Sequence, residues 1–148
     1  MRRGQGRILR FLAVLALASP AALSAQGRVP LQDVATAVAA YWAEGDAAGL
    51  ASLVSDAGAR LHLEGERHPA LPPRQVRATL EDMFGDVRRG SVSVERAEQM
   101  DGSPPRGWAE LRWDTVPPGM AEPVAHRVFI GFMEDGDRWR IAEIRVMR

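Results

Sequence analysis

The sequence predicts an α+β fold in which three helices pack on one face of an antiparallel sheet of four long strands and one short strand. Two patterns along the chain predict it. Apolar residues recur at helical spacing as far as Val87, and from Ser91 onward they alternate with a period of two. Helices followed by a run of long strands are typical of an α+β domain whose helices cover one side of the sheet.

The composition is that of an ordinary globular protein. The 148 residues include 19 basic and 19 acidic side chains, 46% are hydrophobic, and there is no cysteine. This apolar fraction is enough for a buried core, which excludes a disordered tail. The lack of cysteine excludes a disulfide-stapled scaffold.

The first 25 residues have the pattern of a secretory signal peptide. Met1–Arg10 carries four arginines and no acid, Phe11–Ala18 is wholly apolar, and Ala25 supplies the small residue that cleavage requires. The apolar stretch that ends at Ala25 is shorter than the ~20 residues that span a bilayer, which disfavours the alternative of a retained anchor. We therefore expect residues 1–25 to be removed, leaving residues 26–148 as one periplasmic or secreted domain without a membrane anchor.

Helix-ending and helix-starting residues divide the first half of the mature chain. Leu31–Glu44 predicts an amphipathic helix, and Gly45 ends it. Asp46 is a predicted N-cap for a short second helix. Pro72-Pro73 suits the entrance of a third helix that runs to Val87, because proline is tolerated in a first turn.

The strands are predicted from alternation. Ala59–Glu64 forms the short strand. The four long strands are Ser91–Met100, Trp108–Thr115, Val124–Met133 and Arg138–Met147. Asp135-Gly136 is a typical two-residue hairpin turn between the last two.

That turn sets a predicted register. The expected pairs are Phe132 with Trp139, Ile130 with Ile141, Leu111 with Val128, and Trp113 with His126. All eight side chains then share the face that packs on the helices. The apolar positions change parity after Ile141, which favours a β-bulge near Ala142-Glu143. The phase of Ser91–Met100 stays open, because Arg96 follows Val92 and Val94 on the same face.

The order of these elements resembles the nuclear transport factor 2-like superfamily, which includes the SnoaL-like polyketide cyclases and ketosteroid isomerases. The resemblance rests on Tyr41-Trp42, Gly45-Asp46, Leu50, Leu53, the Val76–Phe84 helix and the closing Trp139–Ile141 strand. It covers nearly the whole mature chain and is closest to small exported bacterial domains of unknown function. It implies a cystatin-like cone, with a curved sheet wrapped around the helices, a pocket at the open end and often a dimer across the outer face. Such a fold hosts both enzymes and binding modules, so it implies no activity.

Two functions from different classes are compatible with this cone. The favoured one is non-enzymatic binding of a small apolar ligand or a protein partner. The expected pocket is lined by Trp42, Leu63, Phe84, Trp113, His126, Ile130 and Trp139. The alternative is an isomerase, dehydratase or cyclase with His126 as the base and Tyr41 as the proton donor. Each of these two side chains also has a purely structural interpretation, as a buried packing residue.

The sequence shows no pattern typical of a metal site, a cofactor site or a nucleic-acid-binding surface. His62, His68 and His126 fall on separate segments without ligand spacing, with His68 expected in a loop before Pro69, so we expect no metal site. No phosphate loop, dinucleotide fingerprint or G-x-S-x-G elbow occurs, and no cofactor is expected. Removal of residues 1–25 would leave a charge of −4, unlike the basic surface of a nucleic-acid-binding protein.

The outer face of the sheet is expected to be charged. The predicted register puts Arg112 opposite Arg127, a like-charge pair that requires compensation. The same face is expected to carry Glu110, Asp114, Trp108 and Phe129, with Arg140 nearby. The two acids favour a solvated face laced with ion pairs, and the two aromatic residues keep a homodimer through this face open.

Overall fold

The computed structural model describes residues 27–87 and 90–148. The predicted signal peptide lies outside these described residues. Within them, no helix has both the length and the apolar character that crossing a membrane requires.

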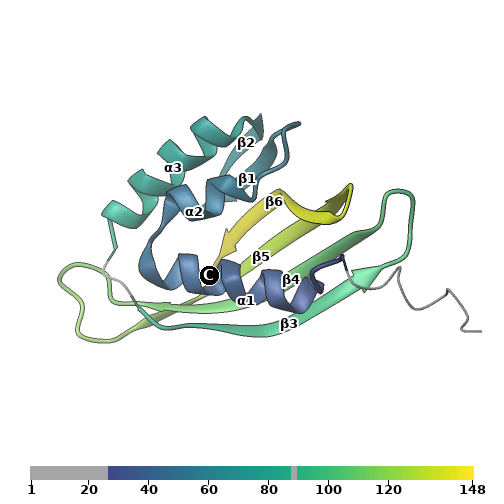
Figure 1. Ribbon diagram of the computed structural model, residues 1–148. Helices are drawn as coiled ribbons and strands as arrows, with labels where there is room; N and C mark the ends of the chain where they lie inside the picture. Colours follow the sequence, from purple (N-terminus) through teal and green to yellow (C-terminus); the bar gives the residue numbers. More distant parts are fainter. Residues whose placement is uncertain (1–26, 88–89) are drawn as a thin grey trace, which may run out of the picture.

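The described part of the chain contains three helices and six strands (Figure 1). In chain order they are α1 (Leu31–Glu44), α2 (Ala47–Ser52), β1 (Ala59–Leu63), β2 (Glu66–Leu71), α3 (Pro73–Gly85), β3 (Val92–Met100), β4 (Arg106–Thr115), β5 (Val124–Asp135) and β6 (Arg138–Met147). The predicted α+β class is confirmed, and all predicted elements are present with ends shifted by at most two residues. Strand β2 was not predicted.

The expected loop around His68 is therefore wrong. The backbone turns at Glu64-Gly65, where φ is 47° and 95°, and β2 runs back along β1. Its sequence does not alternate, and it contains Pro69, which an edge strand tolerates because one of its sides has no ladder to maintain. β2 lies at one edge of the sheet, so both properties fit its position.

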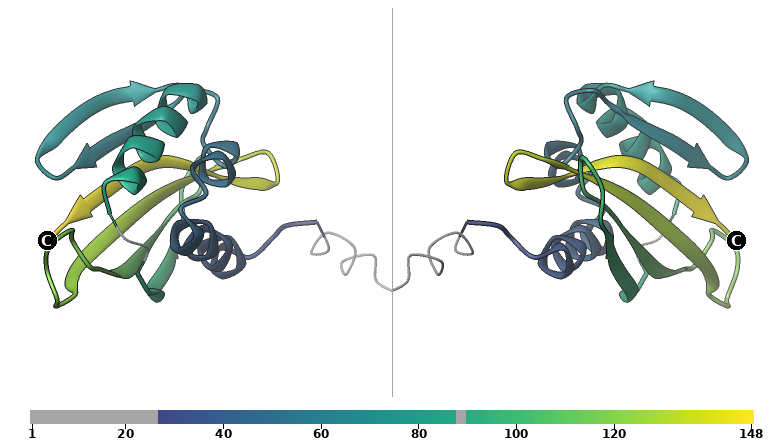
Figure 2. Two further views of the ribbon diagram at one scale, coloured as in Figure 1. Left: turned by 90° about the vertical axis from the view of Figure 1, so that its left-hand side faces the viewer. Right: turned by 90° about the vertical axis from the view of Figure 1, so that its right-hand side faces the viewer.

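The sheet has the strand order β2-β1-β6-β5-β4-β3. Neighbours pair antiparallel except β1 and β6, which are parallel. Figures 1 and 2 show the sheet strongly bent, with the three helices on one side of it. The N-terminal hairpin β1–β2 thus joins the meander of β3 to β6 through its last strand.

The register between β4 and β5 is confirmed, with Leu111 opposite Val128 and Trp113 opposite His126. The predicted register between β5 and β6 is wrong by two residues next to the turn. The turn residues are Gly136-Asp137, since Asp135 pairs with Arg138. As a result Phe132 faces Ile141, Ile130 faces Ile144 and Trp139 faces Glu134. Gly136 has a φ of 65° and is the first residue of the two-residue turn, whereas the prediction made it the second.

Two of the three register irregularities in the described part of the sheet lie in the predicted long strands. Gly131 pairs with Glu143 and Phe132 with Ile141, so Ala142 is an extra residue in β6, as predicted. A second irregularity lies in β3 at Glu95, between the pairs of Val94 and Arg96. This bulge fixes which side chains of β3 face the core, a point that the sequence had left open. Val92 and Val94 face the core before the bulge, and Ala97 does so after it.

The shared inner face is confirmed. The eight residues predicted for it are each at most 5% exposed. They pack against buried side chains of the helices, among them Val38, Trp42, Leu50, Val76 and Leu80.

The N-cap of α2 is also formed as predicted. Asp46 Oδ1 accepts a hydrogen bond from the backbone N–H of Gly49 at 2.8 Å. Replacing Asp46 by alanine is expected to lower the free energy of unfolding by about 1 kcal/mol, because that N–H loses its partner. Urea denaturation checks this, with Asp46→Asn as the control that keeps a capping oxygen. Equal losses in both variants would contradict the capping role.

Candidate functional site

The interior between α1, α3 and β4 is filled by an aromatic cluster. Trp42 of α1, Phe84 of α3 and Trp113 of β4 meet edge to face, with centroid separations of 5.3 Å, 5.7 Å and 6.1 Å. This is the geometry that aromatic quadrupoles favour. The cluster closes the core here, and a cleft of about 240 Å³ remains on its outer side.

A larger cleft opens beside this cluster, between α3, the β1–β2 hairpin and the ends of β4 and β5. Its volume is about 500 Å³. Its floor contains the buried residues Leu63, Trp113 and His126, and its rim carries four exposed carboxylates, Glu64, Glu66, Asp82 and Asp86. We call this the hairpin cleft.

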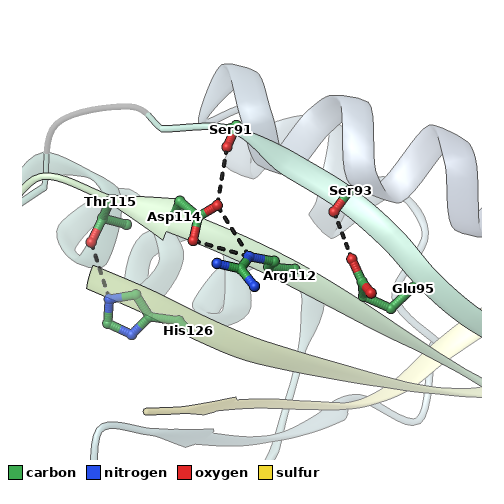
Figure 3. Close-up of polar contacts among 7 residues, drawn as sticks. All are labelled: Ser91, Ser93, Glu95, Arg112, Asp114, Thr115 and His126. Carbon is green, nitrogen blue, oxygen red and sulfur yellow. Dashed lines mark hydrogen bonds and ion pairs between the residues drawn. The ribbon is translucent and has the colours of Figure 1, made fainter. Parts of the chain in front are cut away.

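His126 is the buried titratable residue of the floor. Only 5% of it is exposed, and its ring lies 5.2 Å from that of Trp113. Its Nε2 is 3.0 Å from the hydroxyl of Thr115, as Figure 3 shows. Its Nδ1 is buried and has no hydrogen-bond partner among the described residues. Burial is the main cause that lowers the pKa of His126, with Glu64 acting against it and Arg148 adding to it. The ring is therefore neutral near pH 7.

This lowered pKa predicts a loss of stability in acid. The unfolded chain binds the proton of His126 more readily than the folded chain does, so the contribution is constant above about pH 7. The free energy of unfolding then falls as the pH drops through about 6.5 toward the lower pKa of the folded state. Urea denaturation between pH 8 and pH 5 measures this, and we expect a flatter profile for His126→Gln. The control His62→Gln should keep the steeper profile of the parent. A His126→Gln profile as steep as the parent's would contradict the prediction.

The residues of the predicted pocket divide into three groups. Leu63, Trp113 and His126 line the hairpin cleft. Trp42 and Phe84, again with Trp113, line the smaller cleft beside the aromatic cluster. Ile130 and Trp139 are 0% and 3% exposed and lie within the packed core, away from the lining of both clefts.

Tyr41 and His126 are not brought together. Tyr41 is half-buried on α1 and packs against α2, so closely that a Cβ added at Gly49 would lie 2.5 Å from its ring. No hydrogen bond joins Tyr41 to His126 in residues 27–87 and 90–148. The acid–base pair expected for an isomerase is therefore not assembled in this structure.

The sequence did not point to the four carboxylates of the rim. Glu64 lies in the tight turn of a hairpin whose second strand, beginning at Glu66, was not predicted. Asp82 and Asp86 are four residues apart, a spacing that places two side chains on the same side of a helix. That spacing was the available signal, but it does not reveal that the hairpin faces them.

The outer face carries the predicted charge pattern. Arg112 pairs with Arg127, and each has an acidic partner, Asp114 at 3.2 Å and Glu110 at 3.1 Å (Figure 3 shows the first). Arg140 is not part of this group, because it donates to the backbone oxygen of Ser52. The like charges across the strands are thus compensated as expected.

Trp108 and Phe129 form a second feature of the outer face. Their rings are stacked at a centroid separation of 5.8 Å. Arg96 lies over the first ring and Arg145 over the second, at 5.9 Å and 5.3 Å. The cations cover part of the aromatic surface, which limits its apolar character.

Among the described residues, neither the four carboxylates of the cleft rim nor the ion pairs of the outer face form a metal site. In the ranges 27–87 and 90–148, no group of three or more histidine, aspartate or glutamate side chains is arranged to hold an ion.

Solved structures define the class of this fold. A DUF4783 family protein from Bacteroides uniformis has a TM-score of 0.64 at 19% identity, covering 76% of this chain and 94% of its own. A hypothetical protein with a ketosteroid isomerase-like fold from Catenulispora acidiphila, solved in complex with trimethylamine, has a TM-score of 0.62 at 16% identity and covers 80% and 87%. A cystatin fold protein from Novosphingobium aromaticivorans has a TM-score of 0.60 at 15% identity and covers 81% and 99%. No family model and no curated protein matches the sequence.

The fold is therefore nuclear transport factor 2-like, as the resemblance implied. Designed proteins of that type also match it. The similar natural structures include domains of unknown function, so the likeness establishes the architecture and leaves the activity to the site.

Proposed function

We propose that this protein is an exported binding domain that holds a small molecule in the hairpin cleft without transforming it. The observation that carries the proposal is an open cleft of about 500 Å³ whose floor contains the buried side chains of Leu63, Trp113 and His126. The cleft also lies within the usual volume range of ligand pockets.

Two further observations support binding over catalysis. Tyr41 packs on α2, so His126 has no tyrosine with which to share a proton transfer. The Catenulispora protein, which has a similar fold, was solved with a small molecule bound. The sequence predicted a small apolar ligand. Because the rim of the cleft is acidic, we now expect a ligand with a polar end as well as an apolar one.

A fragment screen by NMR tests the proposal. Cationic, neutral and anionic fragments are added to the purified protein while the indole N–H signals of the tryptophans are followed. We expect at least one fragment to shift the signal of Trp113 and to leave that of Trp139 in place. The proposal fails when no fragment of any charge moves the Trp113 signal.

A pair of variants locates the binding. Thr79 lines the hairpin cleft from α3, whereas its neighbour Ala78 is exposed and does not line it. Thr79→Trp should fill the cleft and abolish the shift, and Ala78→Trp should leave it unchanged. Equal binding by both variants would place the fragment elsewhere.

Export is the second part of the proposal and rests on the pattern of residues 1–25. Expression in a bacterium should yield a processed protein whose first residue is Gln26, as measured by intact mass and N-terminal sequencing. Unprocessed protein that stays in the cytoplasm would contradict it.

A symmetric dimer through the outer face is the second candidate. The stacked Trp108 and Phe129 line a groove of about 370 Å³ together with the exposed Met100. Sedimentation equilibrium tests this candidate, with Trp108→Glu expected to yield a monomer. A monomeric parent protein would exclude the dimer.

A further inference from the structure

One carboxylate lies on the inner face of the sheet. Glu134 follows Ile130 and Phe132 on the inner side of β5, and its side chain is only 6% exposed. Across the hairpin it pairs with Trp139, which is 3% exposed. Taking a carboxylate out of water is costly unless a cation or hydrogen-bond donors replace the lost hydration. Glu134 therefore requires a partner at this end of the core.

The partner comes from the segment that precedes α1. Nε of Arg28 lies 2.7 Å from Oε1 of Glu134, and this is the one ion pair of that carboxylate among the described residues. The segment Gly27–Pro30 is otherwise exposed to solvent, and we call it the strap. Because water and salt screen a buried charge much less than an exposed one, the pair ties the strap to the sheet.

The strap is continuous with the first turn of α1. The backbone oxygen of Pro30 accepts hydrogen bonds from the N–H groups of Asp33 and Val34, at 3.1 Å and 3.3 Å. No side chain of the described residues caps this end of the helix. The first hydrogen bonds of α1 therefore depend on the position in which the strap holds Pro30.

Leu31 closes the core next to the strap. It is 6% exposed, and a Cβ added at Gly107 would lie 2.5 Å from its side chain. The glycine near the beginning of β4 thus leaves the space that Leu31 fills. These contacts lie at the end of β4 and β5 that is away from the hairpin cleft.

We propose that the strap is a releasable latch on the core. The Arg28–Glu134 pair holds the strap and the first turn of α1 against the sheet, and when the pair separates, Leu31 leaves the core while the six strands stay paired. The latch has two states, because a buried carboxylate that loses its cation is unfavourable until water reaches it. The open state provides a second way into the core. None of these residues lines the hairpin cleft, so the latch does not rest on the proposed function.

Amide hydrogen exchange followed by NMR tests whether the strap opens by itself. The amide of Val34 reports on the strap because Pro30 is its acceptor, and the amide of Ile130 reports on the central strands. We expect Val34 to exchange faster than Ile130 and almost independently of low urea concentrations, since a local opening exposes little surface. Exchange at Ile130 should accelerate with urea. Equal urea dependence of the two amides would overturn the latch, because α1 would then open only with the whole fold.

Charge variants test whether the ion pair holds the strap. Arg28→Gln is expected to raise the exchange rate of Val34 about tenfold, since an interaction with a buried charge is worth at least that factor. Adding Glu134→Gln should slow the exchange again, because the double variant leaves no buried carboxylate without a cation. Independent structural roles for the two side chains predict the opposite, a double variant that exchanges faster than either single one. That result would overturn the pair as the latch.

Arg60→Gln is the matched control. Arg60 also pairs with a glutamate, Glu143 at 3.3 Å, but it does so on the outer face of the sheet. Its loss should leave the exchange at Val34 unchanged, and an acceleration equal to that of Arg28→Gln would overturn the latch. Circular dichroism verifies that each variant is folded. Fragment binding to the hairpin cleft should be unaltered in Arg28→Gln, so a failure of the latch and a failure of the proposed function are told apart.

Discussion

Replacing Trp42 by alanine is expected to lower the free energy of unfolding by about 3–5 kcal/mol, the range typical of a buried aromatic residue. Trp42 is 1% exposed, and its ring contacts those of Phe84 and Trp113. The substitution removes the centre of a cluster contributed by two helices and the sheet, so the remaining rings cannot close the space. Urea denaturation measures the change.

Trp108→Ala is the matched control for this prediction. Trp108 is also a stacked tryptophan, but it is partly exposed on the outer face, where Phe129 and Arg96 are its aromatic and cationic neighbours. Its loss is expected to cost about 1 kcal/mol. Equal losses for the two tryptophans would mean that the aromatic cluster is not the main source of stability at this end of the core.

Gly58→Ala is expected to lower the free energy of unfolding by about 2–5 kcal/mol, for two reasons that add. Gly58 has a φ of 89°, which costs a residue with a Cβ about 1–2 kcal/mol. An added Cβ would also lie 2.7 Å from the backbone oxygen of Leu71, and overpacking of this kind costs about 1–3 kcal/mol. Thermal and urea denaturation measure the sum.

Gly65→Ala separates the two causes. Gly65 has a similar φ of 95°, but a Cβ there would meet nothing within 4 Å. It is therefore expected to show the conformational cost alone, about 1–2 kcal/mol. A Gly65 variant as unstable as the Gly58 variant would show that the close approach of β2 to Gly58 contributes nothing.

Local signals predicted the elements that local physics controls. The bounds of α1 and β6 match the predicted ranges, because proline, glycine and clear periodicity mark them. The bulge at Ala142 was predicted from the change of parity that it causes. The predicted register of the last hairpin is wrong because Asp135-Gly136 and Gly136-Asp137 are both acceptable turn dipeptides. The choice between them moves the pairs next to the turn by two residues.

Local sequence signals could not predict strand β2 or the rim of the hairpin cleft. An edge strand has one partner and little burial, so Glu66–Leu71 shows neither alternation nor a continuous apolar run. The juxtaposition of His126 and Trp113 followed from one cross-strand pair and was predicted correctly. The approach of Glu64 and Glu66 to Asp82 and Asp86 depends on how the hairpin docks, which is a tertiary property.

The parallel pairing of β1 with β6 has a consequence for the order in which the sheet forms. Arg60 pairs with Glu143, 83 residues later, and in the strand order β6 separates the hairpin from the rest of the meander. Until β6 docks, the β1–β2 hairpin therefore has no neighbouring strand in the sheet, and among the described elements that directly precede or follow it, it packs on α3. Contacts this distant in sequence form slowly, because a long loop must close first. The six-stranded sheet is thus complete only once β6 has docked between β1 and β5.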